Sequence, residues 1–168
     1  MEPRVSIIMG SVSDYKIMEA AAKTLNDFKI PFEINALSAH RTPDKAEEFA
    51  KGAAGRGIKV IIAAAGMAAH LPGVIAAFTT IPVIGVPINA SLDGLDSILS
   101  ILQMPPGIPV ATVAVNGAQN AAILAAQILA TGDPAVAVTV KEFKETLKNK
   151  IIQANEELKQ VKFEYKTN

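Results

Sequence analysis

The chain of 168 residues contains no cysteine and no tryptophan, and only two of its residues are histidines. The lack of cysteine excludes disulfide bonds and thiolate chemistry, and it favours a cytoplasmic location. Sixteen basic residues balance sixteen acidic ones, so no overall positive field would attract nucleic acid or an anionic membrane. We therefore expect neither a nucleic acid nor a membrane as a partner.

Long uninterrupted apolar runs are also missing. The most apolar stretch, residues 60–88, is interrupted by His70 and by prolines, whereas a membrane-spanning helix needs roughly 20 apolar residues in a row. Residues 1–4 do not show the charged and then apolar pattern of a signal peptide. Since 50% of the residues are hydrophobic, we expect residues 1–168 to form a single domain around one sizeable core.

Basic residues are absent from the whole middle of the chain. Residues 60–140 contain no lysine or arginine, and their only acidic residues are Asp93, Asp96 and Asp133. In a monomer, helices from this region would turn neutral faces to water, carrying Ser97, Ser100, Gln103, Gln119 and Gln127. The centres of subunit contacts are depleted in charge. We therefore predict a homo-oligomer, and a plain neutral surface is the alternative.

Short apolar runs alternate with helical patterns along the chain. Strands are expected at residues 5–9, 32–37, 58–64, 82–87 and 110–115. Helices are expected around residues 14–28, 43–57, 72–78, 95–104 and 118–130. This alternation predicts a five-stranded parallel sheet with helices on both faces, which is a three-layer, doubly wound α/β fold of the flavodoxin-like type.

Residues 134–168 differ from the rest in composition, because lysine and glutamate are frequent there. Apolar residues recur at every third or fourth position, namely Val140, Phe143, Leu147, Ile151, Ala154, Leu158 and Val161. This spacing predicts an amphipathic C-terminal helix. We expect this helical extension to lie on the body of the molecule or on a neighbouring subunit.

A glycine- and serine-containing turn follows the first predicted strand. In Gly10-Ser11-Val12-Ser13-Asp14, Ser13 or Asp14 is expected to cap the first helix. The backbone N–H groups and two hydroxyls of such a turn suit a phosphate group. The turn lacks the lysine and spacing of a Walker loop and the dinucleotide-binding pattern. A serine cap without a ligand explains the turn equally well.

The segment after the second predicted strand reads Ser38-Ala-His-Arg-Thr-Pro43. Arg41 offers a rigid fork of donors for a phosphate or carboxylate, and His40 offers a proton that titrates near neutral pH. Thr42 is expected to cap a helix with Pro43 at its first position. A surface pair of histidine and arginine is the alternative.

The segment after the third predicted strand contains the second histidine, in Ala68-Ala69-His70-Leu71-Pro72-Gly73. Small residues let a substrate approach the backbone closely. A buried core histidine is the alternative interpretation of His70. Because the carboxyl ends of parallel strands share one edge of a sheet, however, we expect all three segments to form one pocket.

Other chemistries fit these residues poorly. A serine hydrolase built from Ser11, His40 and Asp14 would lack the G-x-S-x-G turn that holds such nucleophiles. Two histidines with few acidic residues nearby also make a weak metal site. We therefore expect no metal.

Six motifs together resemble one family. In chain order they are Gly10-Ser-Val-Ser-Asp14, Ser38-Ala-His-Arg-Thr-Pro43, Ala68-Ala-His-Leu-Pro-Gly73, Pro82-Val-Ile-Gly-Val-Pro87, Leu92-Asp-Gly-Leu-Asp-Ser97 and Gln103-Met-Pro105. From the first strand to about Ala130, the chain resembles the class I N5-carboxyaminoimidazole ribonucleotide mutases of purine biosynthesis. The loop around His70 is less similar to the related carboxylases, which use free CO2. Met67 departs from the pattern, because the family usually has a second glycine there.

This resemblance implies an isomerase without a cofactor, which moves a carboxylate from the exocyclic nitrogen to C4 of an aminoimidazole ribonucleotide through CO2 held in a dry pocket. His40 is the implied general acid and base, and His70 with the Ala68-Ala69 backbone would line the carboxylate pocket. The implied substrate-binding residues are Ser11, Ser13, Asp14, Ser38, Arg41, Ala68, Ala69 and Leu71. Arg41 and the turn amides would hold the phosphate, and Asp14 the sugar hydroxyls. The implied assembly is a homo-octamer.

Two alternatives to this function remain open. One is a CO2-dependent aminoimidazole ribonucleotide carboxylase, which makes the same product by another route. The other is a non-catalytic module that binds a nucleotide or flavin on the same fold.

Overall fold

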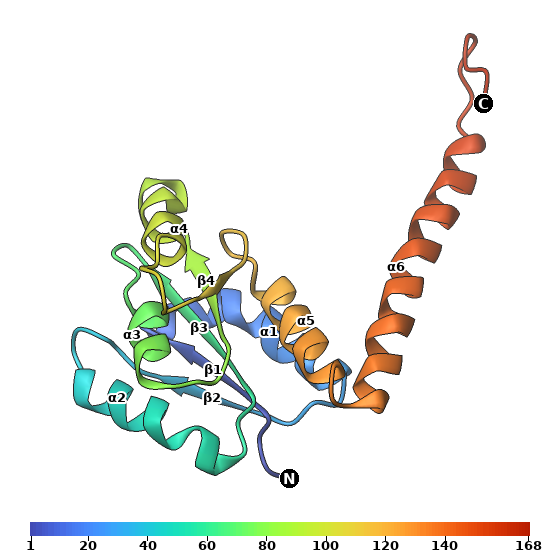
Figure 1. The fold of residues 1–168 in the computed structure, drawn as a ribbon. Helices are drawn as coiled ribbons and strands as arrows, with labels where there is room; N and C mark the ends of the chain where they lie inside the picture. Colours follow the sequence, from blue (N-terminus) through green and yellow to red (C-terminus); the bar gives the residue numbers. More distant parts are fainter.

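The computed structural model describes residues 1–168 and contains one five-stranded sheet (Figure 1). All strands are parallel and lie in the order β2-β1-β3-β4-β5. Their bounds are Val5–Met9 (β1), Phe32–Ala36 (β2), Val60–Gly66 (β3), Val83–Ile88 (β4) and Ala111–Thr112 (β5). The sequence prediction of a doubly wound, flavodoxin-like α/β fold is confirmed.

Helices cover both faces of the sheet. The α-helices are α1 (Tyr15–Asp27), α2 (Pro43–Gly52), α3 (Leu71–Phe78), α4 (Leu95–Leu102), α5 (Ala118–Ala130) and α6 (Pro134–Lys159). There are also three short 3-10 turns, at Val12–Asp14 (η1), Ala54–Arg56 (η2) and Leu92–Gly94 (η3). Helices α1 and α5 pack on one face, and α2, α3 and α4 pack on the other.

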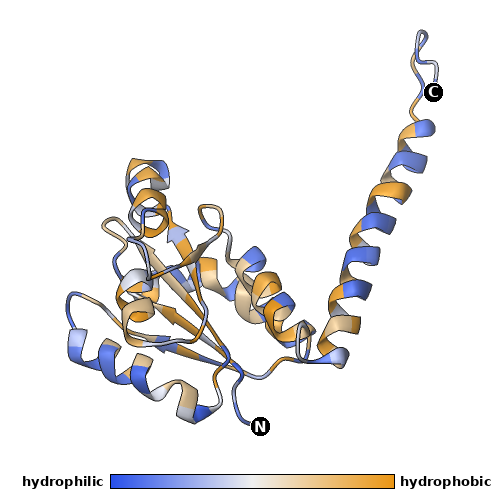
Figure 2. Cartoon of the chain, in the orientation of Figure 1, coloured by the Kyte–Doolittle hydropathy of each residue, from blue (hydrophilic) through white to orange (hydrophobic).

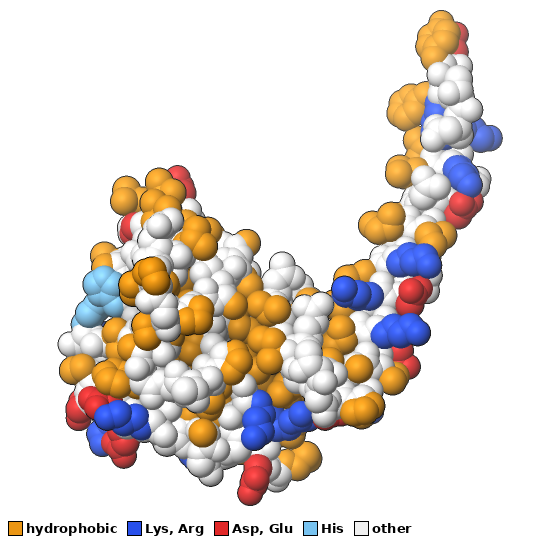
Figure 3. Space-filling model, in the orientation of Figure 1, with side chains coloured by type: hydrophobic (Ala, Val, Ile, Leu, Met, Phe, Trp, Pro, Cys, Tyr) orange, Lys and Arg blue, Asp and Glu red, His pale blue; other side chains and the backbone are white.

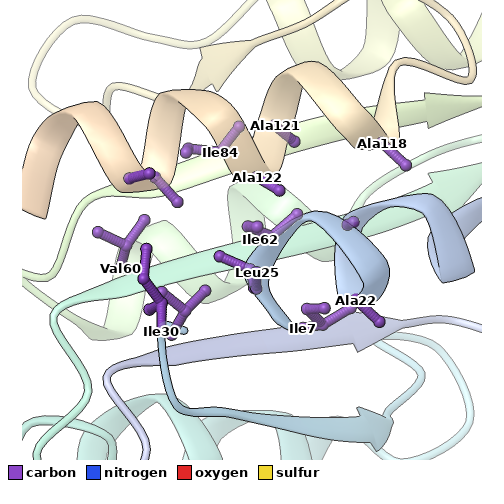
Figure 4. Close-up of a cluster of buried hydrophobic side chains, with 14 of the residues drawn as sticks. Ile7, Ala22, Leu25, Ile30, Val60, Ile62, Ile84, Ala118, Ala121 and Ala122 are labelled. Carbon is purple, nitrogen blue, oxygen red and sulfur yellow. The ribbon is translucent and has the colours of Figure 1, made fainter. Parts of the chain in front are cut away.

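The first core lies between the sheet and helices α1 and α5 (Figure 4). Alternate residues of the strands point into it, such as Ile7, Ile62 and Ile84, and all three are fully buried. Ala121 and Ala122 of α5 let this helix lie close to the sheet. Because each buried isoleucine contributes about 1.5–3 kcal/mol, this layer holds the strands that carry the site loops.

The intervening strand residues face the second core. Ile8, Ile61 and Ala63 pack there against α2, α3 and α4. Every residue of β3 except the last is buried. A strand that is covered on both faces must be apolar throughout, which explains the uninterrupted apolar run that predicted it.

Strand β5 is shorter than the predicted strand 110–115. Its ladder with β4 contains only Ala111 and Thr112. Beyond it, the Val113 N–H donates to the Gly85 carbonyl and the Asn116 N–H donates to the Pro87 carbonyl. Between these two hydrogen bonds, the segment after β5 spans three residues while β4 spans two, so the regular pairing of the two strands ends.

Asp14 and Thr42 stand at the predicted N-cap positions of α1 and α2, with Pro43 at the first position of α2, but neither side chain makes a cap hydrogen bond. The side-chain cap lies one turn earlier, because η1 precedes α1 and the Ser11 hydroxyl accepts the Ser13 N–H at 3.3 Å. Thr42 makes no cap hydrogen bond. Its hydroxyl is engaged with the backbone N–H and C=O of Ser38, each at 3.1 Å.

The prediction that Ser97 lies on an outward, neutral helix face is also wrong. Its side chain is buried, and the hydroxyl lies 3.0 Å from the Ile88 carbonyl and 2.9 Å from the Gly94 carbonyl. Ser97 therefore fastens the start of α4 to the end of β4.

Helix α6 leaves the body as a long arm (Figures 1 and 2). Val136 and Val140 near its start are buried against α5, and the Phe143 ring meets Phe28 edge-on at 5.2 Å. Asp133 caps the helix by accepting the N–H groups of Ala135 and Val136. No helix of the structure combines the length and the apolar character needed to cross a membrane.

Candidate active site

The site lies at the carboxyl edge of the sheet, where the strand order reverses between β1 and β3. The loops after β1, β2, β3 and β4 meet there around a cavity of about 560 Å³. Its lining residues are Gly10, Ser11, Ser13, Asp14, Ser38, Ala39, His40, Arg41, Ala65, Gly66, Met67, Ala68, His70, Leu71 and Ala90. The convergence of the three motif segments is therefore observed.

The loop after β1 presents hydroxyl groups and one carboxylate. The Ser13 hydroxyl lies 2.8 Å from Ser11 Oγ and 3.3 Å from Asp14 Oδ1, within hydrogen-bond distance of both. Burial raises the pKa of Asp14, and hydrogen bonds from Ser13 and from the Ser11 backbone oppose that shift. A partly desolvated carboxylate gains when hydroxyl groups of a ligand replace lost water.

The loop after β2 holds Arg41 at the cavity wall. One terminal nitrogen of the guanidinium donates to the Gly10 carbonyl at 2.8 Å, and Nε lies 3.3 Å from Ser38 Oγ. Ser38 Oγ also accepts the Arg41 backbone N–H at 3.1 Å. These bonds tie the first two loops together and use two of the five N–H donors of arginine, which leaves the others for an anion.

The loop after β3 passes close to the loop after β4. A Cβ atom on Gly66 would lie 2.8 Å from the Ala90 Cβ atom, so only glycine allows this approach. Met67 follows in the left-handed region with φ +57°. The His70 N–H then donates to the Ala68 carbonyl at 2.8 Å, which turns the chain into α3.

The two histidines meet at the cavity. His40 Nε2 lies 2.7 Å from His70 Nδ1, and the two rings are nearly perpendicular, at 81°. Both side chains are exposed and lie at the surface of the body (Figure 3), so the interpretation of His70 as a core histidine is wrong. A bond of this length needs a donor on one ring and a lone pair on the other. The pair can therefore hold one proton between its rings.

All predicted site residues except Ala69 line the cavity. Ala69 is only 1% exposed and packs in the second core. Ala90 was missed in the sequence, although its position after the fourth strand places it at the same sheet edge. Arg41 is the only basic residue of the lining apart from the histidines. No group of three or more histidine, cysteine, aspartate or glutamate side chains lies close enough to hold a metal ion.

These features define an α/β enzyme whose site combines an arginine, hydroxyl groups and paired imidazoles. The family model described as AIR carboxylase matches residues 4–150, and the chain belongs to this family.

Named relatives agree with this assignment. The chain is 56% identical over 160 residues to an N5-carboxyaminoimidazole ribonucleotide mutase of Thermotoga maritima, covering 95% of this chain and 94% of the relative. It is 52% identical to a phosphoribosylaminoimidazole carboxylase of Schizosaccharomyces pombe, covering 95% of this chain but 29% of that longer protein. The crystal structure of Treponema denticola PurE matches with a TM-score of 0.85 and 36% identity, covering 94% of this chain and 99% of that one.

Proposed function

We propose that this chain converts N5-carboxyaminoimidazole ribonucleotide to 4-carboxy-5-aminoimidazole ribonucleotide, as a mutase of purine biosynthesis. The 2.7 Å contact between His40 and His70 inside the cavity carries the proposal, because an isomerisation of this kind needs one proton moved and no other reagent. The high identity to relatives named as this mutase supports it.

The ribonucleotide is held by the first two loops. Arg41 and the backbone amides of the turn after β1 bind the phosphate, because the guanidinium is already oriented by Gly10 and Ser38. The hydroxyl groups of Ser11 and Ser13 add hydrogen bonds, and the Asp14 carboxylate accepts from the sugar hydroxyls. The imidazole ring of the substrate then lies toward the loop after β3.

The reaction moves a carboxyl group between two atoms of one ring system. The N–CO2 bond breaks, its electron pair stays on the exocyclic nitrogen, and this nitrogen takes up a proton. The enamine carbon C4 then donates an electron pair to the carbon of CO2, and C4 loses its proton. Substrate and product are therefore isomers, and the protein contributes position, a dry pocket and proton transfer.

The histidine pair performs the proton transfer. His40 acts as general acid and base. The hydrogen bond to His70 fixes the orientation of the His40 ring, and the His70 ring accepts the proton from His40 or returns it. His70 and the Ala68 backbone line the carboxylate pocket. The remaining wall is apolar, with Ala39, Ala65, Met67, Leu71 and Ala90.

The CO2-dependent carboxylase is the second candidate, because a relative 52% identical to this chain carries a carboxylase name. One assay separates the two. The purified protein is given either the N-carboxylated ribonucleotide, or the decarboxylated ribonucleotide with bicarbonate, and the C4-carboxylated product is measured by chromatography. We expect rapid turnover of the first substrate only. Preference for bicarbonate would establish the carboxylase, and product from neither would refute both.

The active form is a homo-octamer in the cytoplasm, as the family resemblance implies. The apolar stripe of α6 supports association, because only Val136 and Val140 at its start are buried while Leu147, Ile151 and Leu158 remain exposed. Figure 3 shows apolar side chains along one side of the arm and charged ones along the other. A second apolar row on α4 and the turn before it is also exposed, at Leu92, Leu95, Leu99 and Leu102. Such surfaces mark contacts between proteins, and a second copy of this chain carries both.

A further inference from the structure

Met67 combines an unfavourable backbone conformation with an exposed apolar side chain at the cavity. Its φ of +57° lies in the left-handed region, where a side chain crowds the following carbonyl and glycine is favoured. The residue is 61% exposed and lines the cavity. Methionine therefore does not favour the backbone conformation at this position. We look for its contribution in the side chain instead.

The side chain of Met67 also stands apart from the rest of the cavity wall. The other apolar lining residues are alanines and Leu71, and Leu71 is only 2% exposed because it packs in the second core. Met67 is thus the only large apolar side chain of the lining that does not belong to the core. A thioether on three rotatable bonds adapts to a small neutral ligand better than a branched side chain.

We propose that Met67 covers the cavity during turnover and retains the CO2 that is in transit from nitrogen to carbon. This inference rests on the proposed function. After the N–CO2 bond breaks, the electron pair remains on nitrogen. The released CO2 is therefore uncharged, and no ion pair with Arg41 can bind it. Until C4 donates its electron pair to form the new C–C bond, only the walls of the pocket keep CO2 in place. The apolar arm of Met67 closes the wall on the side of the β3 loop.

Isotope retention measures this directly. Substrate labelled with ¹³C in its carboxylate is converted in a single turnover by excess enzyme, in unlabelled bicarbonate with carbonic anhydrase. CO2 that escapes mixes with the unlabelled pool, so the labelled fraction of the product reports CO2 that never left. We expect high retention in the parent and severalfold lower retention in Met67→Gly. The melting temperature of this variant should not fall, because glycine relieves the left-handed backbone.

Two further variants separate the side chain from the backbone. Met67→Ala removes the arm but keeps a Cβ atom in the left-handed region, and we expect it to lose the label as Met67→Gly does. Lys29→Gly is the control, because Lys29 has nearly the same left-handed backbone conformation, with φ +56°, at an exposed turn outside the cavity. Glycine there relieves the same backbone strain. This variant should retain the label as the parent does.

Three outcomes are decisive. Parent-like retention in Met67→Gly and Met67→Ala would overturn the role of Met67 while leaving the mutase function intact. Loss of label in Lys29→Gly would also overturn it, because the effect would then follow backbone relief in general. A parent enzyme that makes no product from the labelled substrate would refute the proposed function itself.

Discussion

The α/β body and helix α6 bury their apolar residues to very different degrees. In the body, isoleucines of three strands are fully buried between the sheet and its helices. In the outer half of α6, Ile151 is 73% exposed and Leu158 is 60% exposed. The hydrophobic effect favours burial of the apolar residues in both regions, yet a single chain buries only those of the body's core. The core of the body is therefore covered within a single chain, whereas the outer half of α6 is left exposed.

The same comparison separates two kinds of apolar surface. The apolar residues that line the cavity are mostly alanines, whose small side chains leave room for a ligand. The stripes on α6 and α4 carry leucine and isoleucine along one face of each helix, which suits another helix or sheet. The proposed function places chemistry in the cavity and association on the two stripes, and variants in each region test this division.

The largest effect is expected in the body, for His40→Asn. Loss of a general acid and base lowers turnover by about 10²–10⁴-fold, while binding of the ribonucleotide stays close to that of the parent because asparagine leaves Arg41 in place. Steady-state kinetics and binding calorimetry measure the two effects. Near-normal turnover would transfer the proton role to His70, and His70→Asn is the variant to compare.

The second effect concerns α6. Ile151→Asp places a charge in the exposed stripe, and burying it unpaired in a subunit contact should cost about 3–5 kcal/mol and dissociate the oligomer. Lys150→Asp introduces the same residue at the neighbouring exposed position, off the stripe, and should leave the assembly intact. Light scattering at micromolar concentration measures the mass. A monomeric parent protein would show that the stripe is not a contact between copies.

Arg41→Lys should have a smaller effect, on binding rather than on turnover. A lysine ammonium cannot contact the Gly10 carbonyl and Ser38 and also bind a phosphate with paired donors. We expect KM to rise by about tenfold, or about 1.4 kcal/mol of binding free energy. Arg56→Lys, at an arginine outside the cavity, is the control. An unchanged KM in Arg41→Lys would remove this residue from the phosphate site.

The smallest effect is expected where the two regions join. The Arg4 guanidinium donates to Asp133 at 2.7 Å and lowers the pKa of that carboxyl, as do the N–H groups that it caps. A lowered pKa in the folded state means stabilisation that is present above the unfolded value of about 3.9 and is lost as pH falls through the folded value. Asp133→Ala should therefore lower the melting temperature at pH 7 by about 2–4 °C.

The pH dependence is the specific part of that prediction. The difference between Asp133→Ala and the parent should shrink as pH falls below about 4. Asp27→Ala changes an exposed aspartate at the end of α1 and should show little effect at any pH. A difference for Asp133→Ala that stays constant down to pH 2 would mean that the ionised carboxylate does not contribute.

Much of the site was predictable from the sequence, because its residues are encoded locally. Each motif stands directly after an apolar run, and parallel strands place all such positions at one edge. The positions of His40, Arg41 and His70 in one cavity follow from that rule alone. Ala90 obeys the same rule, but an alanine offers no chemical signal that would single it out.

Other features depended on atoms far apart in the chain. The short pairing of β5 arises from the spacing of its bonds to β4, and the burial of Ser97 depends on the Ile88 carbonyl. The left-handed conformation of Met67 follows from the turn that β3 makes toward α3. None of these has a local pattern in the sequence.

The amino-acid sequence by itself determined the alternation of strands and helices, the edge at which the polar motifs meet and the amphipathic character of α6. These properties depend on periodicity and on neighbours along the chain, which a sequence displays directly. Only the tertiary structure decided that His40 and His70 share a hydrogen bond, that Arg41 is held by Gly10, and that most of the α6 stripe is left uncovered. Distances of a few ångströms between loops follow from the packing of whole layers, and no local pattern contains them.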